Sequence, residues 1–184
     1  FLLQLMICVR CFVGNGIRKL IDRAVPEGTS VEKTDKVFAT FREYYATHSR
    51  VKTSMYEGME QVMDALKEQN ISMAIVSNKA DDAVKDLAKY YFAKYIDVAI
   101  GEREGISRKP APDSVYEAMR LLGATKENTV YVGDSDVDRA TAKNAGIPCI
   151  SVTWGFRSEE LLVSLEPEYL IHKPEEILSV VTGK

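Results

Sequence analysis

Apolar residues recur at two different spacings along the chain, and the change falls near residue 70. Over residues 16–70 they recur three and four positions apart, as Ile17, Leu20 and Ile21 do. This spacing is typical of amphipathic helices, and it predicts no strand in this stretch. A Pro-Glu-Gly turn at residues 26–28 separates a first helix from a second.

After residue 70, short apolar runs alternate with helical stretches. Strands are predicted over residues 71–76, 98–100, 129–132, 149–152 and 169–171. Helices are predicted after the first strand up to Tyr91, over residues 112–122, up to Asn144 and over residues 174–181, and Gly123 and Gly146 are expected to end two of these helices. Strands that alternate with helices form parallel sheets covered on both faces. We therefore predict an all-helical front segment and an α/β remainder, with the boundary between residues 50 and 57.

The composition is that of a globular protein. Of the 184 residues, 46% are apolar and 28% are charged, which excludes a wholly disordered or collagen-like chain. The 24 basic and 27 acidic residues give a net charge of -3, so no excess of positive charge would gather a polyanion. We expect no binding to nucleic acid. Small or weakly anionic partners fit this charge better.

The cysteines and the first residues bear on location. Cys8, Cys11 and Cys149 are odd in number and form no disulfide framework, which favours the reducing cytoplasm. Cys8 and Cys11 form a Cys-x-x-Cys pair, but no second pair or histidine cluster follows to complete a zinc site. The uncharged run at residues 1–9 is too short for a bilayer, which needs about 20 residues. It also lacks the flanks of a signal peptide, so we expect no membrane segment.

Polar residues follow three of the predicted strands. These residues are Ser77 and Asn78 after the first strand, Lys109 after the second, and Asp134, Asp136 and Asp138 after the third. Ligands of open parallel sheets bind beyond the carboxyl ends of the strands, so these side chains are expected to converge. A hydroxyl can bond phosphate oxygens, an ammonium neutralises them, and carboxylates hold a hard cation such as Mg²⁺. The sequence therefore predicts a site for a phosphate and a divalent cation.

Each of these residues also has a simpler interpretation. Ser77 and Asn78 can start an ordinary turn, and Lys109 can be a solvated loop lysine. Helix capping can account for one of the three acids. Three carboxylates this close repel one another unless a cation or a helix N-terminus offsets their charge. The acid cluster therefore favours metal contact by at least one of its carboxylates.

Taken together, Ser77, Lys109 and the segment Gly133-Asp134-Ser-Asp-Val-Asp138 resemble the second, third and fourth motifs of the haloacid dehalogenase superfamily. The sequence is most similar to the phosphoglycolate phosphatase-like branch of that superfamily. Supporting stretches lie at residues 12–20, 44–58, 76–79, 145–148 and 152–155. The resemblance covers about residues 11 to 184. It implies a Rossmann-like parallel sheet core with an N-terminal helical cap.

The resemblance also implies a Mg²⁺-dependent phosphomonoester hydrolase of small metabolites that works through an aspartyl-phosphate, with 2-phosphoglycolate as the leading substrate. By this likeness Ser77, with Asn78, binds the transferring phosphoryl group and Lys109 neutralises it. Asp134 ligates Mg²⁺, and Asp138 either ligates it or orients the site. Such a site acts by positioning and by stabilising charge.

The front segment resembles the cap that closes over such a site and selects the substrate. On this basis residues 12–55 form the cap and residues 56–184 the core. Asn15, Gly16 and Arg18 are candidates for contacts between cap and substrate. A helix start followed by one surface cation explains these three residues equally well.

The chain departs from the family at its first motif, a strand that ends in Asp-x-Asp and supplies the nucleophile and the general acid and base. The first carboxylate in the sequence is Asp22, which lies in a predicted helix. The strand of that motif is the central one of the family's sheet. Its absence is expected to leave a gap between the strands that end at Ser77 and Asp134, with two unpaired edges.

Three explanations for residues 1–11 stay open. The sequence is a fragment, or its start is aberrant, as after a shifted reading frame, or the apolar run at residues 1–9 fills the strand position in a protein that has given up catalysis. The chain as given is then expected to be inactive for lack of its nucleophilic Asp. The alternative function is a non-catalytic phosphate- or partner-binding protein. The sequence does not predict the oligomeric state.

Overall fold

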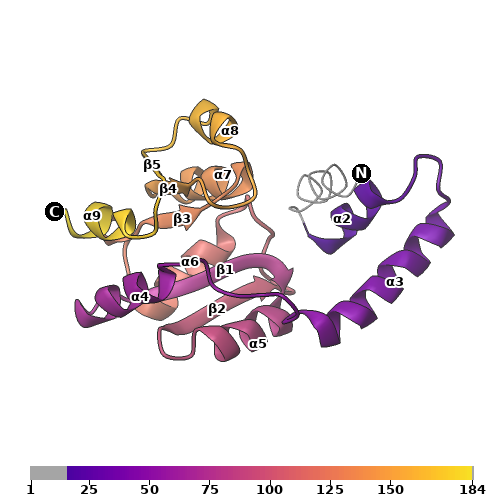
Figure 1. Cartoon of the computed structure of the whole chain (residues 1–184), viewed down its shortest axis with the longest axis horizontal. Coiled ribbons are helices and arrows are strands. Elements are labelled where there is room, and N and C mark those ends of the chain that lie inside the picture. Colours follow the sequence, from indigo (N-terminus) through magenta and orange to yellow (C-terminus); the bar gives the residue numbers. More distant parts are fainter. Residues whose placement is uncertain (1–15, 184) are drawn as a thin grey trace. The chain divides into compact units, whose positions relative to one another are not determined.

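The structure, a computed structural model, describes residues 16–183 (Figure 1). The chain divides into two compact units between Ser54 and Met55. In the described part, the first unit contains only helices and the second contains every strand. No helix among residues 16–183 is long and apolar enough to cross a membrane.

The first unit consists of helices α2 (Ile17–Ala24) and α3 (Val31–His48). Ser30 begins α3, because its side-chain oxygen accepts a hydrogen bond from the N–H of Lys33. Helix α4 (Met59–Glu68) is the first element of the second unit. The prediction that residues 17–70 contain no strand is confirmed.

In the second unit, strands and helices alternate after α4. In chain order the elements are β1 (Met73–Ala80), α5 (Asp81–Tyr91), β2 (Ile96–Glu102), α6 (Asp113–Leu122), a 3₁₀ turn (Lys126–Asn128), β3 (Tyr131–Gly133), α7 (Asp136–Ala145), β4 (Cys149–Val152), α8 (Glu159–Ser164), β5 (Tyr169–Ile171) and α9 (Glu176–Thr182). Gly123 and Gly146 end α6 and α7 in the left-handed conformation, with φ of 65° and 72°. Their predicted role as helix stops is confirmed.

The strands pair in parallel and form two sheets (Figure 1). β1 pairs with β2, and β4 lies between β3 and β5. Among residues 16–183 no strand joins β1 to β3, so each of these strands has one edge without a ladder partner. The predicted α/β fold with parallel strands is confirmed. Ser77 lies in β1 and Asp134 directly follows β3, and the gap that the sequence predicts between these two strands stays a prediction.

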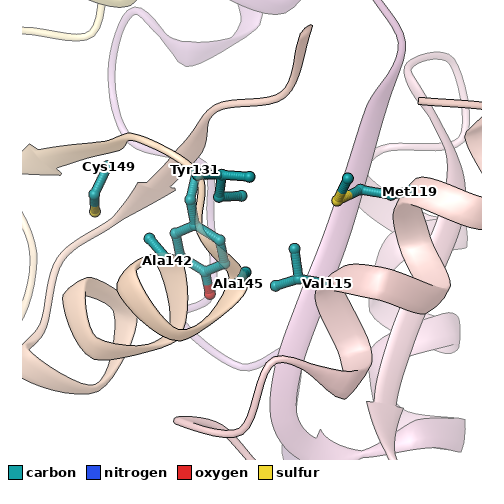
Figure 2. Close-up of a cluster of buried hydrophobic side chains, with 7 residues drawn as sticks. Val115, Met119, Tyr131, Ala142, Ala145 and Cys149 are labelled. Atoms are coloured by element: carbon teal, nitrogen blue, oxygen red, sulfur yellow. The ribbon is translucent and has the colours of Figure 1, made fainter. Parts of the chain in front are cut away.

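Two buried clusters form the hydrophobic core of the second unit. In the first, Tyr131 of β3 packs with residues of α7 and α6, and Figure 2 shows its ring between Ala142 and Ala145, with Val115 and Met119 beyond Ala145. Val76 of β1 also packs against this cluster, so it touches both sheets. The second cluster joins α4 and α9 to β4 and β5 through Val62, Leu66, Ile150, Val152, Ile171 and Ile177.

Some predicted boundaries are wrong by a few residues. β1 begins at Met73 and continues to Ala80, because pairing with β2 resumes between Ala80 and Glu102. The third strand begins at Tyr131 rather than at Thr129. Helix α8 was not predicted from the sequence, and at six residues it is too short for a clear apolar period.

Candidate active site

Ser77 and Asn78 lie where the ladder between β1 and β2 becomes irregular. Pairing is regular up to Val76, and the register then shifts before Ala80. Ser77 was predicted to follow the strand, whereas it lies within β1 at this irregularity. The Oγ of Ser77 accepts a hydrogen bond of 3.1 Å from the N–H of Lys79, which leaves the hydroxyl proton able to donate. Both Ser77 and Asn78 are partly exposed.

The side chain of Asn78 holds the backbone of Lys109. The Asn78 amide donates to the carbonyl oxygen of Lys109 at 2.9 Å, and its Oδ1 accepts from the N–H of Lys109 at 2.8 Å. The side chain thus pairs with both polar groups of one residue. It fixes the loop that follows β2 against the end of β1.

The ammonium of Lys109 is bonded to two buried side chains. Its Nζ lies 2.8 Å from Oδ1 of Asp138 and 3.0 Å from the hydroxyl of Tyr131. The Lys109 side chain is 12% exposed and that of Asp138 is 10% exposed. Because both side chains are buried in a medium of low dielectric, the ammonium and the carboxylate attract each other more strongly than they would at the surface. This attraction holds the ammonium in place.

The carboxylate of Asp138 accepts four hydrogen bonds. Oδ1 accepts from Lys109 and from the hydroxyl of Tyr131 at 2.9 Å, and Oδ2 accepts from the Ser135 hydroxyl at 2.5 Å and from the N–H of Asp134 at 3.3 Å. Burial by itself would raise the pKa of Asp138. The charge and hydrogen bond of Lys109, together with the two hydroxyls, outweigh burial and lower this pKa below its ordinary value. Asp138 is therefore charged and its oxygens are engaged.

Asp134 is held by the loop that follows β4. Its Oδ2 accepts a hydrogen bond of 2.9 Å from the N–H of Phe156. Burial raises the pKa of Asp134, and the negative charge of Asp138 adds to the rise. A cation beside Asp134 would offset both effects. Asp134 is therefore the carboxylate best placed to meet a metal ion.

Asp136 has a different partner from the other two acids. Its Oδ1 accepts from Nε of Arg157 at 2.8 Å, and its side chain is 46% exposed. Helix capping does not explain the acids, because the cap of α7 is Ser135, whose Oγ accepts from the N–H of Asp138. Asp136 and Asp138 lie in the first turn of α7, and Arg157 and Lys109 offset their charges. The repulsion remains at Asp134, whose pKa is raised in part by Asp138.

The donor set can be compared with what a divalent cation requires. No group of three or more His, Cys, Asp or Glu residues is arranged to hold a metal ion within residues 16–183. Mg²⁺ usually keeps several waters and needs only one or two carboxylates together with phosphate oxygens. Asp134, with Asp138 close behind it, fits this requirement for hard oxygen ligands. Asp138 reaches the site through the N–H of Asp134.

The cap candidates are placed differently. Asn15 and the Cys8–Cys11 pair lie outside the described residues. Arg18 bonds to Asp22 at 2.9 Å and to Asp35 of α3, and its guanidinium lies 5.7 Å from the centre of the Phe38 ring. These contacts tie α2 to α3. A role of Arg18 in substrate binding stays a prediction, as does that of Gly16, which precedes α2.

Three features near the acids were not predicted from the sequence. The sequence predicts Tyr131 only as part of an apolar strand, whereas its hydroxyl is hydrogen-bonded to both Lys109 and Asp138. Arg157 and the Phe156 backbone were not assigned any role, although both reach the acids from the loop after β4. A buried tyrosine usually finds a hydrogen-bond partner for its hydroxyl, but the local sequence does not show which residue this partner is.

The sequence and the fold were compared with known proteins. A family model described as haloacid dehalogenase-like hydrolase matches residues 9–152. Pyrophosphatase PpaX of Halalkalibacterium halodurans is 30% identical over 154 residues, which are 83% of this chain and 72% of that protein. Phosphoglycolate phosphatase 1 of Pseudomonas aeruginosa is 30% identical over 176 residues, which are 92% of this chain and 64% of that protein.

The fold is also similar to a crystal structure from Lactobacillus delbrueckii subsp. bulgaricus, of a protein assigned as a phosphoglycolate phosphatase. The TM-score is 0.91 and the sequences are 30% identical. The match covers 97% of this chain and 83% of that one.

Proposed function

Because the chain belongs to the haloacid dehalogenase-like hydrolases, we propose that its core carries the phosphate site of a Mg²⁺-dependent phosphomonoester hydrolase. The observation that carries this proposal is the buried ammonium of Lys109, held by Asp138 and Tyr131 next to Asp134. A lysine whose ammonium is buried and fixed in direction is suited to binding a phosphate, and this burial does not fit a solvated loop lysine.

Each side chain then has a distinct task. The hydroxyl of Ser77 donates to a phosphate oxygen, and Lys109 neutralises the charge of the bound group. Asp134 holds Mg²⁺, which supplies further positive charge to the phosphate when it is bound. Asp138 orients Lys109 and the backbone of Asp134 rather than giving up its engaged oxygens.

Turnover requires a nucleophile in addition to these groups. No Asp or Glu precedes Asp22 in the sequence, so the chain has no Asp-x-Asp ahead of its first helices, where the family's first motif stands. The Asp-x-Asp spacings within residues 134–138 belong to the segment that resembles the fourth motif. We propose that the chain as given binds phosphate and does not hydrolyse phosphomonoesters by itself. A phosphate-binding protein without catalysis is the alternative, and the unpartnered edges of β1 and β3 favour neither over the other.

The substrate follows from the relatives only as a proposal. Phosphoglycolate phosphatase and pyrophosphatase names both occur among the similar proteins, and 2-phosphoglycolate is the substrate that we propose. We propose that the first unit acts as the cap and selects it, with Asn15, Gly16 and Arg18 as candidate contacts. The partner is then a small phosphorylated metabolite, and we propose a cytoplasmic location.

Two assays test this function. The chain is incubated with Mg²⁺ and p-nitrophenyl phosphate, and the proposal expects no release of p-nitrophenol. Turnover that is lost in Lys109→Ala would show instead that the chain is an active enzyme without Asp-x-Asp. Binding of 2-phosphoglycolate and of pyrophosphate is then measured by calorimetry. Tighter binding of pyrophosphate would contradict the proposed substrate.

A further inference from the structure

Lys109 is bonded to both parts of the divided core. Its backbone pairs with Asn78 of β1, and its side chain bonds to Tyr131 of β3 and Asp138 of α7. Within residues 16–183 the sheets of β1 and β3 share no ladder hydrogen bonds. The position of Lys109 is therefore set both by a residue of β1 and by residues of β3 and α7. In the described part, no shared sheet joins β1 to β3.

The side chain of Asn78 is held in place by this arrangement. Its amide nitrogen and its Oδ1 both bond to the backbone of Lys109, at 2.9 and 2.8 Å. One further N–H of the amide remains, but the two bonds fix the direction in which it points, whereas the hydroxyl of the adjacent Ser77 can still turn its proton. The register shift between Val76 and Ala80 places Asn78 outside the regular ladder, which lets its side chain reach the loop of Lys109.

Tyr131 is a rigid partner for the ammonium. Its ring is 7% exposed and packs in the cluster of α6 and α7 (Figure 2), so the hydroxyl cannot move far without disturbing the core. The hydroxyl accepts from Lys109 at 3.0 Å and donates to Asp138 at 2.9 Å. One hydrogen-bond partner is enough for a buried tyrosine hydroxyl, and Asp138 is such a partner. The contact with Lys109 is therefore an additional one.

An ammonium has three donors, and two of them are engaged here. One bonds to Oδ1 of Asp138 and one to the hydroxyl of Tyr131, and no further residue of the described range accepts the third. Two fixed contacts set the direction of the remaining donor. Without the Tyr131 hydroxyl, the ammonium can rotate about its single contact with Asp138.

We propose that Asn78 and Tyr131 are positioning residues for Lys109. Asn78 holds its peptide and Tyr131 holds its ammonium, so that the third donor points to a bound phosphate. Asn78 then acts on the phosphate through Lys109, and the direct contact that the sequence predicts for it stays a prediction. The effect of this arrangement on the affinity for phosphate rests on the proposed function. The restraint on the Lys109 side chain does not depend on that function.

The test measures these two consequences separately. Side-chain order of Lys109 is measured by ¹³C relaxation at Cε, with the signal assigned through Lys109→Arg, and the affinity for inorganic phosphate is measured by calorimetry with Mg²⁺. The variants are Tyr131→Phe and Asn78→Ala. The matched control is Tyr116→Phe, which removes a hydroxyl that bonds to the carbonyl oxygens of Asn144 at 3.4 Å and Ala145 at 3.5 Å, and not to Lys109.

Both test variants are expected to lower the order parameter of Lys109 and to weaken phosphate binding about tenfold, whereas the control changes neither. An unchanged Lys109 order parameter in both variants overturns the positioning role. If the wild-type chain does not bind phosphate, the proposed function fails, and the order parameters still decide the positioning role. If Tyr131→Phe does not fold, Asn78→Ala decides it alone, because this side chain is not part of the buried core.

Discussion

Gly155 lies against Asp134 so closely that a Cβ atom on residue 155 would be 2.1 Å from the Cβ and the Oδ2 of Asp134. Residue 155 therefore has to be glycine if the next N–H, that of Phe156, is to reach the Asp134 carboxylate. The loop after β4 and the acid cluster after β3 are fitted to each other at this point. The Val152-Thr-Trp-Gly155 stretch thus has a structural task that supports the proposed metal ligand.

Gly155→Ala is expected to displace either the loop or Asp134, because the overlap includes the Cβ of Asp134, which cannot rotate away. We expect a loss of about 2–3 kcal/mol in the free energy of unfolding, measured with urea. Gly105→Ala is the control, since that glycine has a φ of 80° but open space around it, and its loss should be about 1 kcal/mol. Equal losses in the two variants would contradict the close fit.

The buried pair of Lys109 and Asp138 predicts a dependence of stability on pH. The pKa of Asp138 lies below its ordinary value of 3.8, so its contribution is fully present above that value and is lost as the pH falls through the lowered pKa. Asp138→Asn should be less stable than the wild type by about 3 kcal/mol at pH 7. The difference should narrow below pH 3.8. A difference that stays constant down to pH 3 would argue against the pair.

Asp134 and Asp136 should respond differently to the same substitution. Asp134→Asn is expected to remove the effect of Mg²⁺ on the affinity for inorganic phosphate, because it removes the proposed ligand. Asp136→Asn breaks only a half-exposed pair with Arg157, so the Mg²⁺ effect should remain within about twofold, in line with a cost below about 1 kcal/mol. Calorimetry with and without Mg²⁺ checks this. Similar losses in both variants would mean that Asp134 has no special role.

Cys149 should not react in the native protein. It is fully buried between β3 and β5, and burial raises its pKa to about 11. At pH 8 only about one thiol in a thousand would be the reactive thiolate, even without the steric barrier. Iodoacetamide followed by site-resolved mass spectrometry should label Cys149 only in concentrated urea. Labelling at the same rate in native buffer would contradict the packing of β4 in the core.

The fold was largely predictable because its strands are short apolar runs bounded by turn residues. The limits of β4 and β5 agree with the predicted runs, 149–152 and 169–171. β1 extends further than predicted, since Ser77 to Ala80 are polar or small and join the strand only through pairing that resumes at Glu102. Tertiary pairing of this kind has no signal in the local sequence.

The residues of the candidate site were predictable where a charged residue comes after a predicted strand in the sequence. Lys109, Asp134 and Asp138 were found in this way, and the structure brings them together. The role of Tyr131 could not be found, because its hydroxyl meets a lysine 22 residues earlier and an acid 7 residues later only after β3 and α7 have packed. The bonds of Asn78 likewise depend on a residue 31 positions away.

The binding of inorganic phosphate tests the central claim most directly. The wild-type chain, Lys109→Met and Ser77→Ala are titrated with phosphate in a calorimeter in the presence of Mg²⁺, and circular dichroism verifies that each protein is folded. The account predicts binding to the wild type and a loss of at least about tenfold in Lys109→Met, because a charged hydrogen bond is removed. Ser77→Ala should bind more weakly than the wild type. A folded wild-type chain that does not bind phosphate, or a folded Lys109→Met that binds it equally well, would contradict the account.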